Sequence, residues 1–273
     1  MQVNHSVLVV GCGNMGAALA GGYAAAHPQA RVVAVDREPL RARSLLPANS
    51  GVVVLDTVAA LADWQPDLVI LALKPQVLGD VLPELVGRCA GALVVSIAAG
   101  TSLGRLRQLL GGQRRLVRAM PNLAVVVGCG MSLLHAGRDD LSAADAALAE
   151  AFFATVGATA WVADEAMIDA GTAVAGSGPA YFFALVEHLA AAGVGEGLPA
   201  ELAARLARQT CIGAAVLLAA DPRAPGELKA AVCSPRGTTE AGLAAMEGAG
   251  GLPAVVAAGV AAAHRRAREL AAD

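Results

Sequence analysis

The sequence predicts an α/β N-terminal domain with a doubly wound, mostly parallel sheet, followed by an all-α C-terminal domain. Two observations carry this prediction. Short apolar runs alternate with helical patterns in the first part of the chain, which is typical of βαβ units. Beyond residue 164 no further strand pattern is evident, and the chain is rich in Ala and Leu at helical spacing. We therefore expect two domains, at residues 1–164 and 165–273.

Eight short apolar runs are expected to form the sheet, because they have the length and composition of buried strands. They are Ser6–Val10, Arg31–Val35, Val52–Leu55, Leu68–Leu73, Ala92–Ile97, Arg115–Ala119, Met131–His135 and Thr159–Val162. Helical patterns lie between most of them, notably at Ala17–Ala26 and Ser142–Thr155.

The second half is expected to contain six helices. They are Glu165–Val174, Ala180–Ala192, Pro199–Ala220, Pro225–Ala231, Thr239–Met246 and Pro253–Ala271. Gly176 and Gly178 weaken a helix, whereas Pro179 suits the first turn of a new one. So many apolar faces in a short segment favour an interface with a second copy over a self-contained bundle.

The first strand leads directly into Gly11-Cys12-Gly13-Asn14-Met15-Gly16, which matches G-x-G-x-x-G. In this motif the first glycine makes a tight turn, the second lets a pyrophosphate approach, and the third lets the helix pack closely. Asp36 lies 20 residues after Gly16, where an acid meets the adenosine ribose in Rossmann domains. The order of strand, turn and helix favours dinucleotide binding over a glycine-rich turn without a ligand.

Three more segments follow strands, so they should lie at the same carboxyl edge of the sheet. They are Lys74–Gln76, Ala98–Thr101 and Met120–Asn122. Later in the chain, the polar segment Cys233–Glu240 runs into a helix, whose free N–H groups could hold a carboxylate. Each nearby hydroxyl is a candidate for helix capping or for ligand contact, namely those of Ser177, Ser234, Thr238 and Thr239.

The composition excludes several classes of protein. The net charge of −3 and the lack of a basic run argue against a nucleic-acid partner. No unbroken apolar run reaches about 18 residues, so no membrane span is expected, and no secretion signal is evident. Five cysteines without a CxxC pair suit a reducing compartment. The cysteines, histidines and carboxylates show no metal-ligand spacing, so no metal is expected. Together these features are those expected of a soluble cytoplasmic protein.

The motifs VGCGNMGAAL, LALKPQ, SIAAG, RAMPN, AGSGPAYFF and PGELKAAVCSPRGTTEAGLAAME lie along nearly the whole chain. With them the chain resembles the pyrroline-5-carboxylate reductase family, and the last two are the most specific. The resemblance implies reduction of the C=N bond of 1-pyrroline-5-carboxylate to L-proline, the last step of proline biosynthesis. It also implies a Rossmann-type domain, NADPH or NADH as cofactor, and a helical domain that forms at least a dimer.

The resemblance also assigns residues. The expected contacts with the pyrophosphate are made by Gly11, Cys12, Gly13, Asn14, Met15 and Gly16. Asp36 and Arg37 are expected at the adenosine ribose. The nicotinamide half is expected to contact Ala72, Leu73, Lys74, Pro75, Ala98 and Ala99. Substrate contacts fall to Glu165, Ser234, Gly237, Thr238 and Thr239, of which Thr239 would face the ring nitrogen as the catalytic residue. No nucleophile or metal is needed, because a protonated imine accepts hydride directly.

The chain departs from the family pattern at four places. Arg236 stands where Gly is usual, Leu123-Ala124 where Thr-Pro is common, Ala224 where His is frequent and Ala230 where Asp is frequent. Asp36 would repel the 2′-phosphate of NADPH whereas Arg37 could pair with it, so both cofactors are expected to work. The alternatives are a related imine or β-hydroxyacid reductase acting on another small acid, and a cofactor-sensing protein without turnover.

Overall fold

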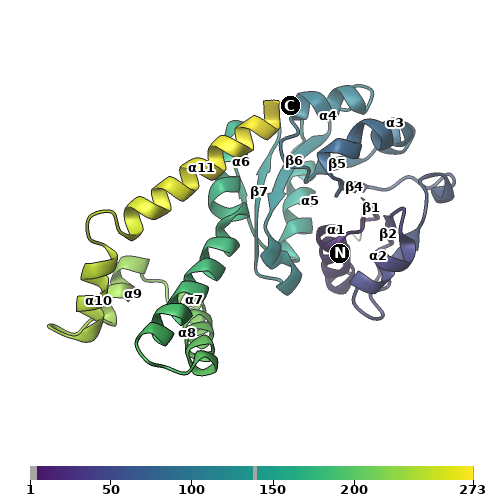
Figure 1. Cartoon of the computed structure of the whole chain (residues 1–273). Helices are drawn as coiled ribbons and strands as arrows, with labels where there is room; N and C mark the ends of the chain where they lie inside the picture. Colours follow the sequence, from purple (N-terminus) through teal and green to yellow (C-terminus); the bar gives the residue numbers. More distant parts are fainter. Residues whose placement is uncertain (1–4, 138–139, 273) are drawn as a thin grey trace. The chain divides into compact units, whose positions relative to one another are not determined.

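The computed structural model describes residues 5–137 and 140–272, which divide into two compact units. Described residues up to Ser177, together with those from Ala263 onward, form the first unit, and Gly178–Ala262 form the second. Figure 1 shows the sheet of the first unit in purple to teal and the helices of the second in green to yellow.

The first unit contains one sheet in the order β3-β2-β1-β4-β5-β6-β7-β8, in which only the β6–β7 pair is antiparallel. Its strands are β1 (Val7–Val10), β2 (Val32–Val35), β3 (Val53–Leu55), β4 (Leu68–Leu71), β5 (Leu93–Ser96), β6 (Leu116–Pro121), β7 (Gly130–His135) and β8 (Gly157–Trp161). The chain winds outward from β1 to β3, then crosses to β4 and winds the other way, so β1 and β4 flank the switch point. The predicted doubly wound sheet is confirmed, with strand ends within two residues of those expected.

Helices cover both faces of this sheet (Figure 1). They are α1 (Asn14–Ala26), α2 (Pro39–Leu45), α3 (Leu78–Cys89), α4 (Leu103–Leu109), α5 (Ala143–Ala154) and α6 (Ala166–Gly171), with short turns η1 (Ala59–Leu61), η2 (Pro75–Val77), η3 (Leu123–Val127) and the π-turn η4 (Thr172–Gly176). Tyr23 of α1 and Phe152 of α5 stack in the core of one face. Leu82 of α3 and Leu106 of α4 fill the core of the other. The central strands are buried on both faces, which explains their unbroken apolar sequences.

A capping box starts α5 and joins it to the sheet. The Ser142 hydroxyl accepts the Asp145 N–H at 3.1 Å, and the Asp145 carboxylate accepts the Ser142 N–H at 3.1 Å. Asp145 also binds the guanidinium of Arg115, the residue that precedes β6. Burial acts to raise the pKa of Asp145, but the hydrogen bonds from Arg115 and Ser142 outweigh it and hold this pKa below its usual range. This carboxylate therefore stabilises the fold above its unfolded pKa.

The second unit is helical, as predicted. It contains α7 (Gly178–Gly195), α8 (Ala200–Ala220), α9 (Pro225–Ala231), α10 (Thr238–Met246) and the start of α11 (Leu252–Ala272). Ala203 and Ala207 are buried, and a Cβ on Gly193 of α7 would lie 3.4 Å from the Ala203 Cβ of α8. Small residues thus let α7 and α8 pack closely.

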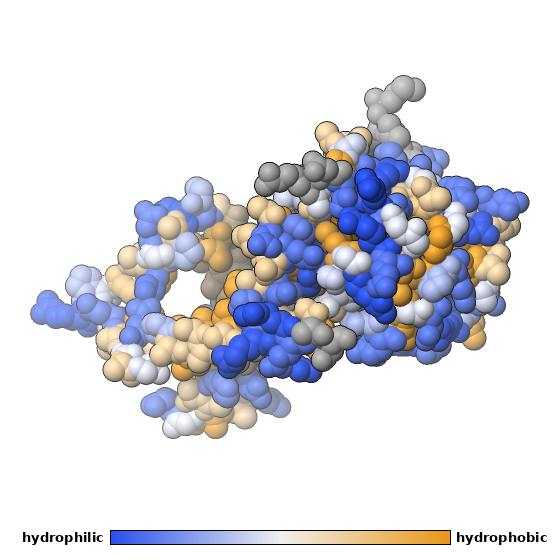
Figure 2. Space-filling view, turned by 90° about the horizontal axis from the view of Figure 1, so that it is seen from above, coloured by the Kyte–Doolittle hydropathy of each residue, from blue (hydrophilic) through white to orange (hydrophobic). Residues whose placement is uncertain are grey.

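Large apolar side chains remain exposed over this helical unit. In Figure 2 orange and pale-orange residues lie among blue ones on its surface. Phe182 and Phe183 are 62% and 63% exposed, and Val216, Leu217 and Val255 are similarly uncovered. Within the described residues, α8 alone is long and apolar enough to cross a membrane, by length and composition only. Helices that bury an apolar face against protein pass the same test, so the observation is weak evidence for a span. Exposed apolar surface of this extent is typical of protein interfaces.

The two compact units part after Ser177, beyond the boundary expected at residue 164. The reason is local packing, since α6 and η4 lie against β6 and β7. A Cβ on Gly171 would collide with the side chain of Leu133 on β7, and Asn122 donates to the carbonyl of Ala175 at 3.1 Å. The end of α11 also returns to the first unit, where the Leu270 carbonyl lies against Gly100.

Candidate active site

The glycines of the loop between β1 and α1 have different surroundings. Gly11 has φ +89°, and a Cβ there would collide with the Ala72 carbonyl of the neighbouring strand. A Cβ on Gly16 would collide with the Gly11 carbonyl, so this glycine lets α1 lie on its own turn. A Cβ on Gly13 would meet no atom of the described chain within 4 Å. The first and third glycines therefore serve packing, and the second faces open space, as a pyrophosphate site requires.

The start of α1 suits an anion. Its N-cap residue is Gly13, which has no side chain to cap the helix, and its first turn carries no acidic residue. The first N–H groups of α1 can therefore bind a phosphate, with the helix dipole favouring the negative charge. Cys12 beside them is buried, and burial, followed by the charge of Asp36, raises its pKa to about 11. The thiol is thus neutral at physiological pH, and the loop residues fit a dinucleotide.

Asp36, directly after β2, lies against this loop. One carboxylate oxygen accepts the Cys12 N–H at 2.7 Å, and the other accepts the Glu38 N–H at 2.9 Å. Asp36 therefore ties the glycine loop to the turn between β2 and α2, while each oxygen keeps a lone pair for a further donor. Arg37 follows with an exposed side chain. Their predicted contacts with the adenosine ribose stay a prediction.

The residues expected at the nicotinamide follow the two strands next to β1. Ala72, Leu73, Lys74 and Pro75 follow β4, and Ala98 and Ala99 follow β5. The Ala72 N–H donates to the Val10 carbonyl at 2.8 Å, which extends the β1–β4 pairing into the site. The Ala98 N–H donates to the Ser96 hydroxyl at 3.3 Å. The expected cofactor residues thus come together at the carboxyl ends of β1, β2, β4 and β5.

Asn122, at the end of β6, uses its amide within the protein. Its Oδ1 accepts the N–H groups of Ala124 and Met131, both at 3.2 Å, and its Nδ2 donates to the Ala175 carbonyl at 3.1 Å. The segment Met120–Asn122 was expected to contribute to the site. Its contacts hold β6, η3, β7 and η4 together, and the contribution of this segment to the site stays a prediction.

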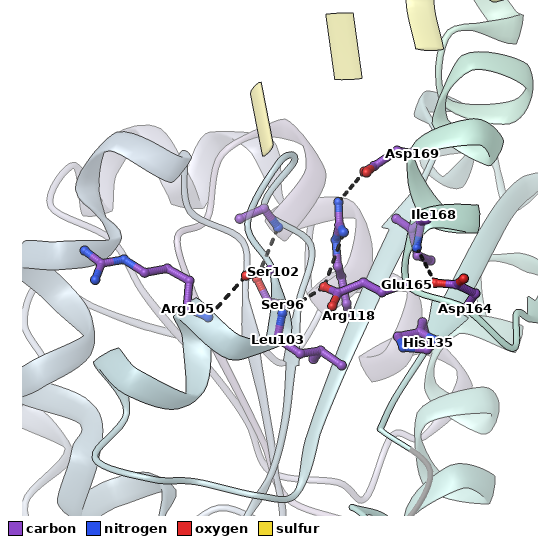
Figure 3. Close-up of polar contacts among 12 residues, drawn as sticks. Ser96, Ser102, Leu103, Arg105, Arg118, His135, Asp164, Glu165, Ile168 and Asp169 are labelled. Carbon is purple, nitrogen blue, oxygen red and sulfur yellow. Dashed lines mark hydrogen bonds and ion pairs between the residues drawn. The ribbon is translucent and has the colours of Figure 1, made fainter. Parts of the chain in front are cut away.

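Glu165 is part of an ionic network around the buried guanidinium of Arg118, shown in Figure 3. Its Oε1 accepts the Leu103 N–H at 2.8 Å and lies 3.3 Å from the guanidinium of Arg118. The same guanidinium lies 2.6 Å from the carboxylate of Asp169. Arg118 and Asp169 were not among the residues predicted from the sequence. A charged residue inside the apolar strand LVRAM was the available signal, because a buried charge requires a partner. The predicted contact of Glu165 with substrate stays a prediction.

The expected substrate loop lies in the second unit and leads into α10. Gly237 is the N-cap of this helix, and its N–H donates to the Ser234 carbonyl at 2.9 Å. α10 starts at Thr238, one residue earlier than predicted, so Thr239 lies in the first helical turn. The glycine at the N-cap leaves the N–H groups of this turn free for an acceptor such as a carboxylate.

Comparisons with known proteins identify the family. A family model described as pyrroline-5-carboxylate reductase dimerisation matches residues 165–270, and one described as NADP oxidoreductase, coenzyme F420-dependent, matches residues 6–100. A pyrroline-5-carboxylate reductase of Pseudomonas aeruginosa is 39% identical over 97% of this chain and 96% of its own length. The chain belongs to the pyrroline-5-carboxylate reductase family. The corresponding protein of Arabidopsis thaliana is 38% identical over 96% of this chain and 94% of its own.

Solved structures of the family share the whole fold. A pyrroline-5-carboxylate reductase from Coxiella burnetii matches with a TM-score of 0.88 and 32% identity over 98% of both chains. A pyrroline carboxylate reductase from Plasmodium falciparum, with NADP bound, matches with a TM-score of 0.80 and 26% identity over 98% of both chains. A prephenate dehydrogenase from Aquifex aeolicus, at a TM-score of 0.51 and 20% identity, shares the fold alone. The family resemblance is confirmed, and NADP or NAD is the cofactor class.

Arg236 is the departure from the family pattern that has a visible backbone consequence. Its φ is +60°, in the left-handed region that favours glycine. Its N–H is held by the Glu240 side chain of α10. The reductase loop therefore keeps a conformation suited to glycine while carrying an exposed cationic side chain at that position.

Proposed function

We propose that this protein reduces the C=N bond of 1-pyrroline-5-carboxylate to give L-proline, with NADPH or NADH as hydride donor. The observation that carries the proposal is the 39% identity to a pyrroline-5-carboxylate reductase over 97% of the chain. The open glycine loop and the uncapped start of α10 support it, because the reaction needs a dinucleotide site and a carboxylate site. Residues 1–164 are assigned to cofactor binding, and residues 165–273 to substrate contacts and dimerisation.

In the proposed site the protein binds the cofactor and the substrate and orients them for hydride transfer. The loop Gly11–Gly16 holds the pyrophosphate, and the segments Ala72–Pro75 and Ala98–Ala99 line the nicotinamide half, whose ring supplies the hydride when bound. Ser234, Gly237 and Thr238 surround the substrate carboxylate, and the free N–H groups in the first turn of α10 hold it. These contacts fix the imine carbon against the hydride donor, and such orientation is the main source of rate in a reaction of this kind.

Thr239 is proposed to hydrogen-bond the ring nitrogen through its hydroxyl. A free hydroxyl is a poor acid, so the proton on the imine nitrogen comes from water or from a substrate that binds already protonated. A hydrogen bond that strengthens as the nitrogen becomes an amine lowers the barrier without proton transfer from Thr239.

The active species is proposed to be at least a dimer in the cytoplasm. The exposed apolar side chains of α7, α8 and α11 support this, as does the match to a dimerisation family over residues 165–270. Obligate interfaces commonly bury more than ~2,000 Å². No part of the proposal requires a nucleic acid or a membrane.

The test is an assay of NADPH and NADH oxidation with 1-pyrroline-5-carboxylate, with L-proline measured as product. The six-membered analogue, the 2-carboxylate isomer and a β-hydroxyacid with NADP⁺ are run in parallel. We expect the five-membered 5-carboxylate imine to give the highest kcat/KM. Turnover of a keto acid or a hydroxy acid, without turnover of the five-membered imine, would overturn the assignment. Cofactor binding without turnover of any substrate would favour a cofactor-sensing protein instead.

A further inference from the structure

Arg118 is a buried cation on the sheet. It stands on β6 directly opposite Ser96 of β5 and His135 of β7, so three polar side chains form a row on one sheet face. Arg118 is 3% exposed. A guanidinium at this depth costs free energy unless its donors are satisfied by acceptors of opposite charge.

Two carboxylates from one short segment satisfy it. Arg118 Nη2 lies 2.6 Å from Asp169 of α6, and Nη1 lies 3.3 Å from Glu165, the residue that precedes α6. The planar guanidinium can address both carboxylates at once, which a lysine ammonium at the same place could not do equally. Arg118 therefore fixes the start of α6 against β6.

Glu165 extends this connection to a third element. The oxygen that faces Arg118 also accepts the N–H of Leu103, the first residue of α4, at 2.8 Å. α4 is entered from the loop Ala98–Ser102, whose beginning is held by the Ser96 hydroxyl. This loop contains the residues assigned to the nicotinamide half. Figure 3 shows the resulting chain of contacts from Leu103 through Glu165 and Arg118 to Asp169.

We propose that Arg118 is a positioning residue for hydride transfer, acting through Glu165 and Asp169. It fixes the nicotinamide-side loop Ala98–Ser102 relative to α6, from which the chain continues into the helical unit. Glu165 then acts as a hydrogen-bond acceptor inside the protein and does not touch the substrate. This inference rests on the proposed function, because it assigns the loop to the nicotinamide.

The experiment compares Arg118→Lys with Arg115→Lys. Arg115 is a matched control, since it directly precedes the same strand, at the amino end of β6 and away from the site, and pairs with the carboxylate of Asp145. Each protein is assayed with the five-membered imine, and rates are normalised to the number of NADP⁺-binding sites. We expect Arg118→Lys to lower kcat about 10-fold or more, since small misplacements of reacting groups are costly, and Arg115→Lys to leave it near wild type.

An isotope effect separates positioning from loss of folded protein. With NADPH deuterated at the transferred position, misplacement should slow the hydride step and raise the isotope effect on kcat above that of the wild type. A merely structural role would lower the number of active molecules and leave this isotope effect unchanged. The affinity for NADP⁺ should change less than about 3-fold, because the glycine loop and Asp36 are untouched.

Glu165→Gln and Glu165→Ala provide a second, independent comparison. Gln keeps the acceptor oxygen for Leu103 and Arg118, so it should lower kcat much less than Ala does. Ala removes that oxygen and should lower kcat as Arg118→Lys does. An equal rise of the imine KM in both variants would place Glu165 at the substrate and overturn the proposal, as would equal kcat and isotope effects in Arg118→Lys and Arg115→Lys. A wild type without imine reduction would instead refute the proposed function.

Discussion

The two compact units differ in how completely they bury their apolar side chains. In the first, the central strands β1, β4 and β5 are almost fully buried, and helices on both sheet faces complete the core. In the second, Ala203 and Ala207 are buried between α7 and α8, while Phe182 and Phe183 stay exposed. The first unit therefore closes its own core, whereas the second leaves large apolar side chains exposed, which is typical of protein interfaces.

The two loops assigned to ligands differ in the same way. The glycine loop of the first unit has glycine wherever a Cβ would collide, so its conformation agrees with its sequence. The loop before α10 holds Arg236 at φ +60°. Local sequence and local backbone thus agree in the cofactor loop and conflict in the loop assigned to the substrate. Strain of this kind persists where the surrounding structure holds it in place.

The largest effect is expected from a substitution on the exposed apolar surface of the second unit. Phe183→Glu on α7 should dissociate the dimer and abolish activity, because a central apolar side chain at an interface contributes about 2 kcal/mol or more. Leu40→Glu on α2 is the matched control, since Leu40 is 78% exposed in the first unit. Its effect on stability should stay within about 0.5 kcal/mol. Sedimentation equilibrium gives the oligomeric state of both variants, and thermal denaturation gives the stability of Leu40→Glu. An active monomer of the wild type would contradict the comparison.

A pair of glycine variants sharpens the account of the cofactor loop. Gly11→Ala should destabilise the fold by about 3 kcal/mol, because it combines a left-handed φ with a collision at Ala72. Gly13→Ala should leave stability near wild type, since its Cβ meets no described atom, but should weaken NADP⁺ binding about 10-fold or more. Thermal denaturation and binding titrations give the two quantities. Equal stability losses would mean that the two glycines share one role.

Two neighbouring threonines test the substrate loop. Thr239→Ala should lower kcat/KM by about 5- to 150-fold, since one hydrogen bond at a reacting group contributes roughly 1–3 kcal/mol. Thr238→Ala should lower it less, because its hydroxyl is not assigned to the ring nitrogen. Steady-state kinetics with the five-membered imine provide the measurement. Small and equal losses would remove Thr239 from the mechanism.

Cofactor preference depends on Asp36 and Arg37. A like-charge contact with the 2′-phosphate costs about 1–2 kcal/mol, which Arg37 can offset, so we expect less than about a 30-fold preference between the two cofactors. Asp36→Ser should shift the ratio of kcat/KM values toward NADPH. It should also weaken both cofactors, because the hydrogen bond to the Cys12 N–H is lost. An unchanged ratio would show that Asp36 serves only the loop.

The smallest expected effect concerns Arg236. Arg236→Gly should stabilise the fold by about 1 kcal/mol, because glycine adopts a positive φ without a Cβ conflict. Thermal denaturation of variant and wild type is the measurement. Ala62, which also has a positive φ of 50° in the first unit, provides a control through Ala62→Gly. A loss of stability in Arg236→Gly alone would show that the arginine side chain contributes contacts in the assembled protein.

The sequence by itself determined the elements and the cofactor loop. Strand runs such as VLVV, and the glycines from Gly11 to Gly16, carry their signal within a few neighbouring positions, because burial and backbone conformation act locally. The π-turn η4 and the early start of α10 make the observed helix ends differ from the predicted ones, but the architecture is the same. The segment from Gly176 to Gly178 was predicted to interrupt a helix for the same local reason.

Only the tertiary structure decided which partners the polar side chains take. Arg118 and Glu165 are 47 positions apart, and Glu165 and Leu103 are 62 apart. The carboxylate of Asp36 binds the N–H of Cys12 across 24 positions. Such pairs depend on strand order and on how α4 and α6 pack on the sheet, which no local pattern encodes. The pattern could indicate that a buried charge needs a partner, but the packing of the sheet and its helices selected that partner.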